Sequence, residues 1–146
     1  MDSSKPSIFA ATATVFLVED NPTDSYLSRM AMERTIAMPL QIVAADTGEY
    51  ALELLRHHCS NHKCPNVVLL DLSLPDISGH EVLAQVRAEP LLKDVPVVIL
   101  TGSDDPEDQR RAREAGASDY WIKPMGMIGY MDIMRRLRGY LDTAAR

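Results

Sequence analysis

Short runs of consecutive apolar residues recur along the chain and alternate with longer stretches in which apolar residues follow a helical period. The runs lie at residues 15–18, 40–44, 67–70, 97–100 and 120–122. Because apolar residues fill these runs without alternating with polar ones, we expect strands that are buried on both faces. Such strands form a parallel sheet that helices cover on both sides.

Helix start signals stand in the stretches between the runs. Cap residues mark helix starts, two of them with proline at the first helical position, at Asn21-Pro22, 46–49, 78–81 and Asp105-Pro106. Gly116 stands where the helix after Asp105 should end. Strand-then-helix units that repeat in this way predict a doubly wound α/β domain with a five-stranded parallel sheet.

Length and charge narrow the class of protein. The chain has 146 residues, which is the size of one domain with a full core. Its 15 Lys and Arg residues against 21 Asp and Glu give a net charge of −6, so no basic surplus exists to neutralise the phosphates of a nucleic acid. No apolar run reaches the ~18 residues of a membrane span. Residues 7–18 could belong to a signal peptide, but they lead directly into Glu19-Asp20 within a predicted strand, so we expect a cytoplasmic location.

Cysteines and histidines gather in one short stretch, HHCSNHKC, at His57, His58, Cys59, His62 and Cys64. A zinc site needs four converging ligands, and this stretch could supply them. A polar loop that leaves a helix is the simpler interpretation, because no second pair of ligands stands elsewhere in the chain. The two cysteines, without a wider pattern, also suit a reducing cytoplasm.

Reactive side chains follow the predicted strands at the point where each one ends. They are Glu19-Asp20 after the first strand, Asp71 after the third, Thr101-Gly102-Ser103 after the fourth and Lys123-Pro124 after the fifth. In an open parallel α/β sheet these ends meet at one edge, where ligands bind. Clustered carboxylates repel one another unless a cation joins them, and an all-oxygen ligand set suits Mg²⁺. Lys123 and Thr101 would then face an oxyanion such as a phosphoryl group.

Four sequence motifs occupy these positions: FLVEDN, VVLLDLSLPDISG, VVILTGS and GASDYWIKP. Together they resemble the receiver domain of response regulators. The resemblance covers residues 14–141, with an N-terminal extension at 1–13 and a short tail at 142–146. It implies a flavodoxin-like strand order of 2-1-3-4-5.

The resemblance also implies a role for each residue at the strand ends. Asp71 would be the phosphoacceptor, and Lys123 would bind the phosphoryl group, with a cis peptide bond to Pro124. The implied ligands of Mg²⁺, or of Mn²⁺, are Glu19, Asp20, Asp71 and the backbone carbonyl of Ser73. The remaining roles are a switch hydroxyl, a phosphoryl-binding backbone N–H and a rotating aromatic ring, at Thr101, Gly102 and Tyr120.

The implied reaction is phosphorylation of the domain by its own catalysis from a kinase phosphohistidine, so we do not expect a conventional enzyme. A haloacid-dehalogenase-type phosphatase would need a second aspartate two residues after Asp71, where Ser73 stands. A flavodoxin-like FMN binder would need a glycine- and hydroxyl-rich phosphate loop where the chain has EDNPTD. The alternative that stays open is a receiver-like module that binds partners without phosphorylation.

The acidic pair Glu19-Asp20 departs from the commoner Asp-Asp pair of receiver domains. Together with NPTD, it resembles the single-domain regulators that partner bacterial phytochromes. The expected partner is therefore a sensor histidine kinase, with a bacterial phytochrome as the candidate.

The last predicted helix, at about residues 127–141, carries more apolar side chains than a surface helix needs. Only five residues follow Leu141, so we expect the signal to leave through the surface of the domain itself. A homodimer through the last two helices and the last strand would use such a surface. The side chains expected to form this partner face are Tyr130, Ile133, Met134 and Leu137. The alternative is that the wide apolar arc belongs to the core.

Overall fold

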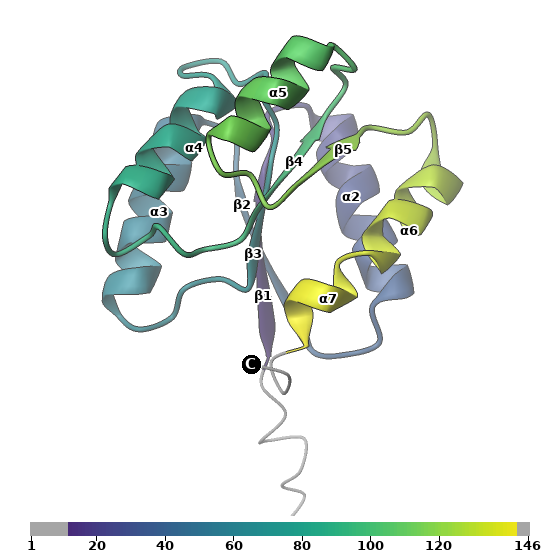
Figure 1. Cartoon of the computed structure of the whole chain (residues 1–146). Coiled ribbons are helices and arrows are strands. Elements are labelled where there is room, and N and C mark those ends of the chain that lie inside the picture. The colour runs from purple at the N-terminus through teal and green to yellow at the C-terminus, as the bar shows by residue number, and fades with distance from the viewer. Residues whose placement is uncertain (1–11, 143–146) are drawn as a thin grey trace, which may run out of the picture.

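The computed structural model describes residues 12–142, and their strands form one parallel sheet in the order β2-β1-β3-β4-β5 (Figure 1). The strands are β1 Ala13–Val18, β2 Leu40–Ala45, β3 Val67–Leu70, β4 Val97–Thr101 and β5 Asp119–Ile122. Every predicted strand is present, and the predicted fold and strand order are confirmed. The central strands β3 and β4 are buried along their whole length, as their continuous apolar runs predicted.

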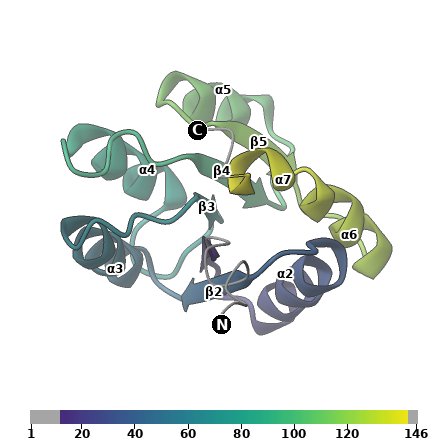
Figure 2. The ribbon, with the colours of Figure 1, turned by 90° about the horizontal axis from the view of Figure 1, so that it is seen from below.

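Helices cover both faces of the sheet. They are α2 Pro22–Thr35, α3 Gly48–Ser60, α4 Gly79–Ala88, α5 Pro106–Glu114, α6 Met127–Arg135 and α7 Arg138–Leu141. One face packs against α3, α4 and α5, and the other packs against α2, α6 and α7 (Figures 1 and 2). Between residues 12 and 142, no helix has both the length and the apolar character to cross a bilayer.

The helices begin where the cap residues predicted. The side chains that accept a backbone N–H from the first helical turn are Asn21, Thr47, Ser78 and Asp105. Gly116 has a φ of 95° just after α5, in the left-handed region that ends many helices. The predicted last helix, at about residues 127–141, is divided into α6 and α7. The backbone N–H groups of Arg136 and Leu137 donate to carbonyl groups three residues back, and this tighter turn separates the two helices.

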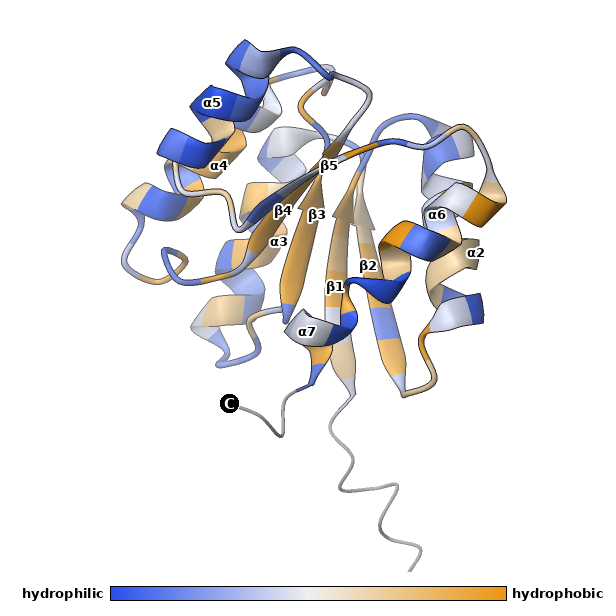
Figure 3. Cartoon of the chain, turned by 45° about the vertical axis from the view of Figure 1, so that its right-hand side comes forward, coloured by the Kyte–Doolittle hydropathy of each residue, from blue (hydrophilic) through white to orange (hydrophobic). Residues whose placement is uncertain are grey.

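The expected exposed partner face on the last helix is wrong. The side chains of Tyr130, Ile133, Met134 and Leu137 are 1%, 8%, 0% and 0% exposed. They lie in the apolar cluster that α2, α6 and α7 share with the sheet. Figure 3 shows hydrophobic stretches along the strands and on the ribbons of α2 and α6. Helix α6 packs along α2 as well as over the sheet (Figure 2), so its apolar arc covers two surfaces and must be wide. These four side chains are therefore core residues.

The structure joins Cys59 and Cys64 in a disulfide, so their spacing does not indicate the reducing compartment that the sequence suggested. The ring of His58 packs edge-on against Phe16, with 5.0 Å between ring centroids. Among the described residues, the His, Cys, Asp and Glu side chains grouped closely enough for a metal ion lie elsewhere in the fold. The simpler interpretation of the stretch, a helix end and its loop, is the one that the structure supports.

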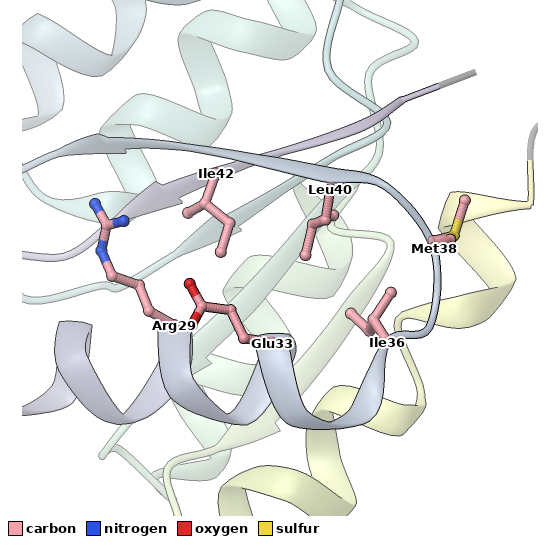
Figure 4. Close-up of a pocket in the computed structure, with 6 residues that line it drawn as sticks. All are labelled: Arg29, Glu33, Ile36, Met38, Leu40 and Ile42. Carbon is pink, nitrogen blue, oxygen red and sulfur yellow. The ribbon is translucent and has the colours of Figure 1, made fainter. Parts of the chain in front are cut away.

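A surface pocket of about 310 Å³ lies between α2 and the edge strand β2 (Figure 4). Its lining residues are Arg29, Glu33, Ile36, Met38, Leu40 and Ile42. Leu40 begins β2, so the pocket lies toward the amino end of that strand, away from the edge where the strand-end side chains meet. It is not part of the predicted site.

Gly79 lets α4 begin against the backbone at the end of β3. Its N–H donates to the carbonyl oxygen of Leu72 at 2.9 Å, and a Cβ at this position would meet the backbone of Asp71 and Leu72. Alanine must displace that backbone, so Gly79→Ala is expected to lower the free energy of unfolding by about 1–3 kcal/mol in urea titrations. Gly139→Ala in α7 is the control, since a Cβ there meets nothing within 4 Å. Equal stability of Gly79→Ala and wild type would contradict the close approach.

Candidate functional site

Three carboxylates lie together at the carboxyl edge of the sheet. Glu19 and Asp20 follow β1, and Asp71 follows β3, which pairs with β1. The Asp71 N–H donates to the carbonyl oxygen of Val18 at 3.1 Å and so continues the strand pairing into the site. Each of the three side chains has an oxygen within 4.8 Å of the others. Glu19 and Asp71 are buried, whereas Asp20 is exposed.

The ammonium group of Lys123 lies among these carboxylates. Lys123 follows β5, and its N–H donates to the carbonyl oxygen of Thr101 at 2.7 Å. Its Nζ lies 2.8 Å from Glu19 Oε1, 3.0 Å from Asp71 Oδ2 and 2.8 Å from Asp24 Oδ2. The structure therefore brings Glu19, Asp71 and Lys123 together, as the strand-end pattern predicted.

Asp24 is a site residue that the sequence analysis missed. Asn21 and Pro22 start α2 directly after the acidic pair, so the first turn of this helix stands at the same edge of the sheet. Asp24 lies in that turn, and this position in the sequence could have predicted it as a site residue. Its Oδ1 also accepts a hydrogen bond from the hydroxyl of Tyr130 at 3.4 Å. Tyr130, which the sequence assigned to a partner face, thus belongs to the surroundings of the site.

For both Glu19 and Lys123, burial shifts the pKa in one direction and the oppositely charged neighbours shift it in the other. Burial raises the pKa of Glu19 to about 7, against the hydrogen bond from Lys123 that would lower it. Burial also acts to lower the pKa of Lys123, but hydrogen bonds to Asp24, Glu19 and Asp71 outweigh it and raise that pKa above its usual value. Lys123 therefore stays charged at neutral pH, and the raised pKa of Glu19 lies close to neutral pH.

The donor set fits a hard divalent cation. All of its side-chain donors are carboxylate oxygens, and they approach one another closely enough to share one ion. Ser73 lies beside them, since its N–H donates to Asp71 Oδ1 at 3.2 Å. The part of its backbone carbonyl as a further ligand stays a prediction.

The loop after β4 borders the site on its other side. Thr101 ends β4 and is buried, and its hydroxyl oxygen accepts the Ser103 N–H at 3.4 Å. The Tyr120 hydroxyl donates to the carbonyl oxygen of Ser103 at 2.8 Å, so the ring and the loop are in direct contact. Gly102 has open space around it, because a Cβ there would meet nothing within 4 Å. The predicted switch residues Thr101 and Tyr120 therefore meet through Ser103.

The prediction of a cis peptide bond between Lys123 and Pro124 is wrong, since no cis bond occurs among the described residues. The side chain of Lys123 reaches its carboxylate partners with the trans bond in place. The ring of Pro124 lies where a Cβ on Gly129 would fall, so the loop packs closely on α6.

These features define a class of protein. The family model described as the response regulator receiver domain matches residues 15–135, and the chain belongs to this family. The fold and the strand-end site thus place it in two-component signalling.

Two curated relatives show how the family varies in length. The chain is 36% identical over 127 residues to the probable methanogenesis regulatory protein FilR2 of Methanothrix harundinacea, covering 86% of this chain and 81% of the relative. It is 35% identical to a probable cyclic di-GMP phosphodiesterase of Vibrio cholerae, but that match spans 78% of this chain and only 24% of the relative. The phosphodiesterase name therefore describes a much longer protein and is not carried over to this chain.

Several solved structures resemble the chain along most of its length. The phosphorylated cyanobacterial phytochrome response regulator RcpA has a TM-score of 0.82 at 30% identity, over 93% of this chain and 98% of its own. The Mn²⁺-bound form of the response regulator Rcp1 has a TM-score of 0.78 at 30% identity, over 90% and 96%. The bacteriophytochrome response regulator AtBRR has a TM-score of 0.70 at 34% identity, over 90% and 93%. The structural neighbours thus include response regulators of phytochromes.

The raised pKa of Glu19 predicts that cation binding depends on pH. The folded chain holds this proton up to about pH 7, whereas an ordinary glutamate has a pKa of 4.5, so the group's contribution to stability falls as the pH rises between these values. A metal ligand must be deprotonated, so Mg²⁺ binding should release more protons at pH 6, below this pKa, than at pH 8, above it. Calorimetry in two buffers of different ionisation enthalpy measures the release.

Glu19→Gln is the control for this measurement, because it keeps the shape of the side chain and has no proton to lose. It should bind Mg²⁺ more weakly and show little proton release at either pH. Equal proton release by wild type at pH 6 and pH 8 would contradict the assignment of the titrating group to Glu19.

Proposed function

We propose that this chain takes a phosphoryl group from the phosphohistidine of a sensor histidine kinase onto Asp71, in a Mg²⁺-dependent reaction that switches a protein–protein interaction face. The observation that carries the proposal is the position of Asp71. It directly follows β3, which lies between β1 and β4, so it adjoins both the acidic pair and Thr101.

The transfer is a displacement at phosphorus. A carboxylate oxygen of Asp71 bonds to phosphorus while the P–N bond to the donor imidazole breaks. The bonding pair stays on the imidazole nitrogen, which takes up a proton from solvent, and Asp71 becomes an acyl phosphate. Because the nucleophile and the phosphoryl oxygens are all negative, the barrier is largely electrostatic. Lys123, at 3.0 Å from Asp71, is placed to bind a phosphoryl oxygen and offset this charge.

The carboxylates supply the cation site for this reaction. Glu19, Asp20, Asp71 and the backbone carbonyl of Ser73 would hold Mg²⁺, or Mn²⁺ in its place. The bound cation would supply positive charge that draws the phosphoryl oxygens toward Asp71. The Mn²⁺-bound form of Rcp1 supports a divalent cation in a similar fold.

The contacts of the loop after β4 support the switch. A phosphoryl group on Asp71 would accept hydrogen bonds from the Thr101 hydroxyl and the Gly102 N–H. Thr101 would then no longer hold Ser103, whose carbonyl oxygen accepts the Tyr120 hydroxyl. Movement of this loop therefore changes the position of Tyr120 and the surface around β5. A local charge event would in this way select between two packings of one face.

Exposed apolar side chains beside the site support docking of a kinase. Met125 lies two residues after Lys123, and Ile128 is the second residue of α6; they are 102% and 80% exposed. Tyr26, two residues after Asp24, is 59% exposed. Exposed apolar groups around a charged site suit the contact surface of a phosphohistidine-bearing helix. The EDNPTD motif and the phytochrome regulators among the structural neighbours support a bacterial phytochrome as the kinase. We propose the cytoplasm as the location of this transfer.

The proposal predicts that Asp71 alone accepts the phosphoryl group. Intact mass after incubation with acetyl phosphate and Mg²⁺ should show one added phosphoryl group on wild type and none on Asp71→Asn, because the amide is not nucleophilic. Lys123→Ala should still bind Mg²⁺ but label slowly. Labelling of Asp71→Asn together with loss of labelling in Asp20→Asn would move the nucleophile to another residue.

Docking through the exposed apolar side chains predicts that a substitution there slows phosphoryl transfer from a kinase but not from a small phosphodonor. Ile128→Asp should slow transfer from a phosphorylated histidine kinase that labels wild type by about tenfold, since a buried interface carboxylate must be desolvated. Labelling by acetyl phosphate should stay unchanged. Leu91→Asp is the matched control, because Leu91 is 50% exposed and lies before β4, at the opposite edge of the sheet. A loss with both donors would assign Ile128 to the site itself rather than to docking.

A further inference from the structure

The ammonium of Lys123 uses all of its hydrogen-bonding capacity on carboxylates. An ammonium has three donors, and Nζ has three partners within 3.0 Å, on Glu19, Asp24 and Asp71. Two of these partners, Glu19 and Asp71, also belong to the group that could hold a metal ion. Asp24 does not belong to that group. Its contact with Lys123 can therefore persist when a cation binds the other carboxylates or a phosphoryl group is attached to Asp71.

Asp24 is itself held from two directions. Its backbone N–H donates to the side chain of Asn21 at 2.9 Å, which fixes it in the first turn of α2. Its Oδ1 accepts from the hydroxyl of Tyr130, while its Oδ2 accepts from Lys123. The two carboxylate oxygens therefore have separate partners, one on α6 and one on the loop after β5.

Tyr130 is suited to hold a carboxylate in place. Its side chain is 1% exposed, and α6 packs along α2, so the ring cannot turn away without opening the core. Burial raises the pKa of Tyr130 to about 12, and the charge of Asp24 adds to the effect. The phenol is thus protonated at neutral pH and donates its hydrogen to Asp24.

We propose that Asp24, held by Tyr130, is a positioning residue that keeps the ammonium of Lys123 beside Asp71 during phosphoryl transfer. The inference rests on the proposed function and adds two residues to it. A lysine side chain has a flexible four-carbon stem with many rotamers, so an unheld ammonium must be ordered at each transfer. Asp24 keeps it ordered beforehand, which is the condition for electrostatic catalysis.

The main test is Asp24→Asn, which removes the charge and keeps the size of the side chain. Labelling by acetyl phosphate at fixed Mg²⁺ should slow about tenfold, while the Mg²⁺ dissociation constant from calorimetry should change less than about threefold. Tyr130→Phe should slow labelling by about two- to fourfold, because it removes only the support of Asp24. Glu33→Gln is the matched control, an equal charge change at an exposed position on the same helix, and should label like wild type.

A double-mutant cycle separates positioning from a purely structural role. Beryllofluoride, a phosphoryl mimic, is titrated in the presence of Mg²⁺ and its affinity is read by fluorine NMR. Asp24→Asn should weaken this affinity in the wild-type background and leave it unchanged within about twofold when Lys123 is already alanine. Urea titrations check that each variant is folded, and Tyr130→Phe supplies the result if Asp24→Asn is not.

The possible outcomes are distinct. Unlabelled wild type would overturn the proposed function itself. Labelled wild type with an equally fast Asp24→Asn would overturn only the positioning role. Equal weakening of beryllofluoride binding by Asp24→Asn with and without Lys123 would show that Asp24 acts on the fold or on the cation, and would also overturn it.

Discussion

Mutual repulsion of carboxylates at one edge of the sheet is the constraint on which the site depends. Two buried charges within 4.8 Å of each other, as the carboxylates of Glu19 and Asp71 are when both are ionised, repel by at least about 3 kcal/mol at the effective dielectric constant of protein sites. The structure offsets this cost with one ammonium, shared among three acids, and with a proton on Glu19 near neutral pH. The same excess of negative charge would attract a divalent cation to the site.

Local signals in the sequence predicted the strands, the helix starts and the strand-end residues. Continuous apolar runs mark buried parallel strands, and the caps at Asn21, Thr47, Ser78 and Asp105 depend only on neighbours a few residues away. Because parallel strands end at one edge, the order of the elements was sufficient to gather Glu19, Asp71 and Lys123. These features could be predicted because none of them requires knowledge of side-chain packing.

The features that the sequence could not show arise from contacts between distant elements. Asp24 and Lys123 are 99 positions apart, and Asp24 and Tyr130 are 106 apart. Nothing in the periodicity of α6 distinguishes an arc that faces solvent from one that covers both α2 and the sheet, so Tyr130 was placed on the surface. The Cys59–Cys64 bond likewise depends on how the chain turns after α3, which the spacing of two cysteines does not fix.

The close contact between Gly79 and the backbone of Asp71 divides the site into a fixed part and a movable part. The N–H of Gly79 bonds to Leu72, and no room exists between the start of α4 and the end of β3. The main chain that carries Asp71 is therefore packed closely against the start of α4. A rearrangement that follows a change at Asp71 is expected in the segment after β4, where Gly102 has open space around it. The packing thus determines which segment beside Asp71 can move before any partner binds.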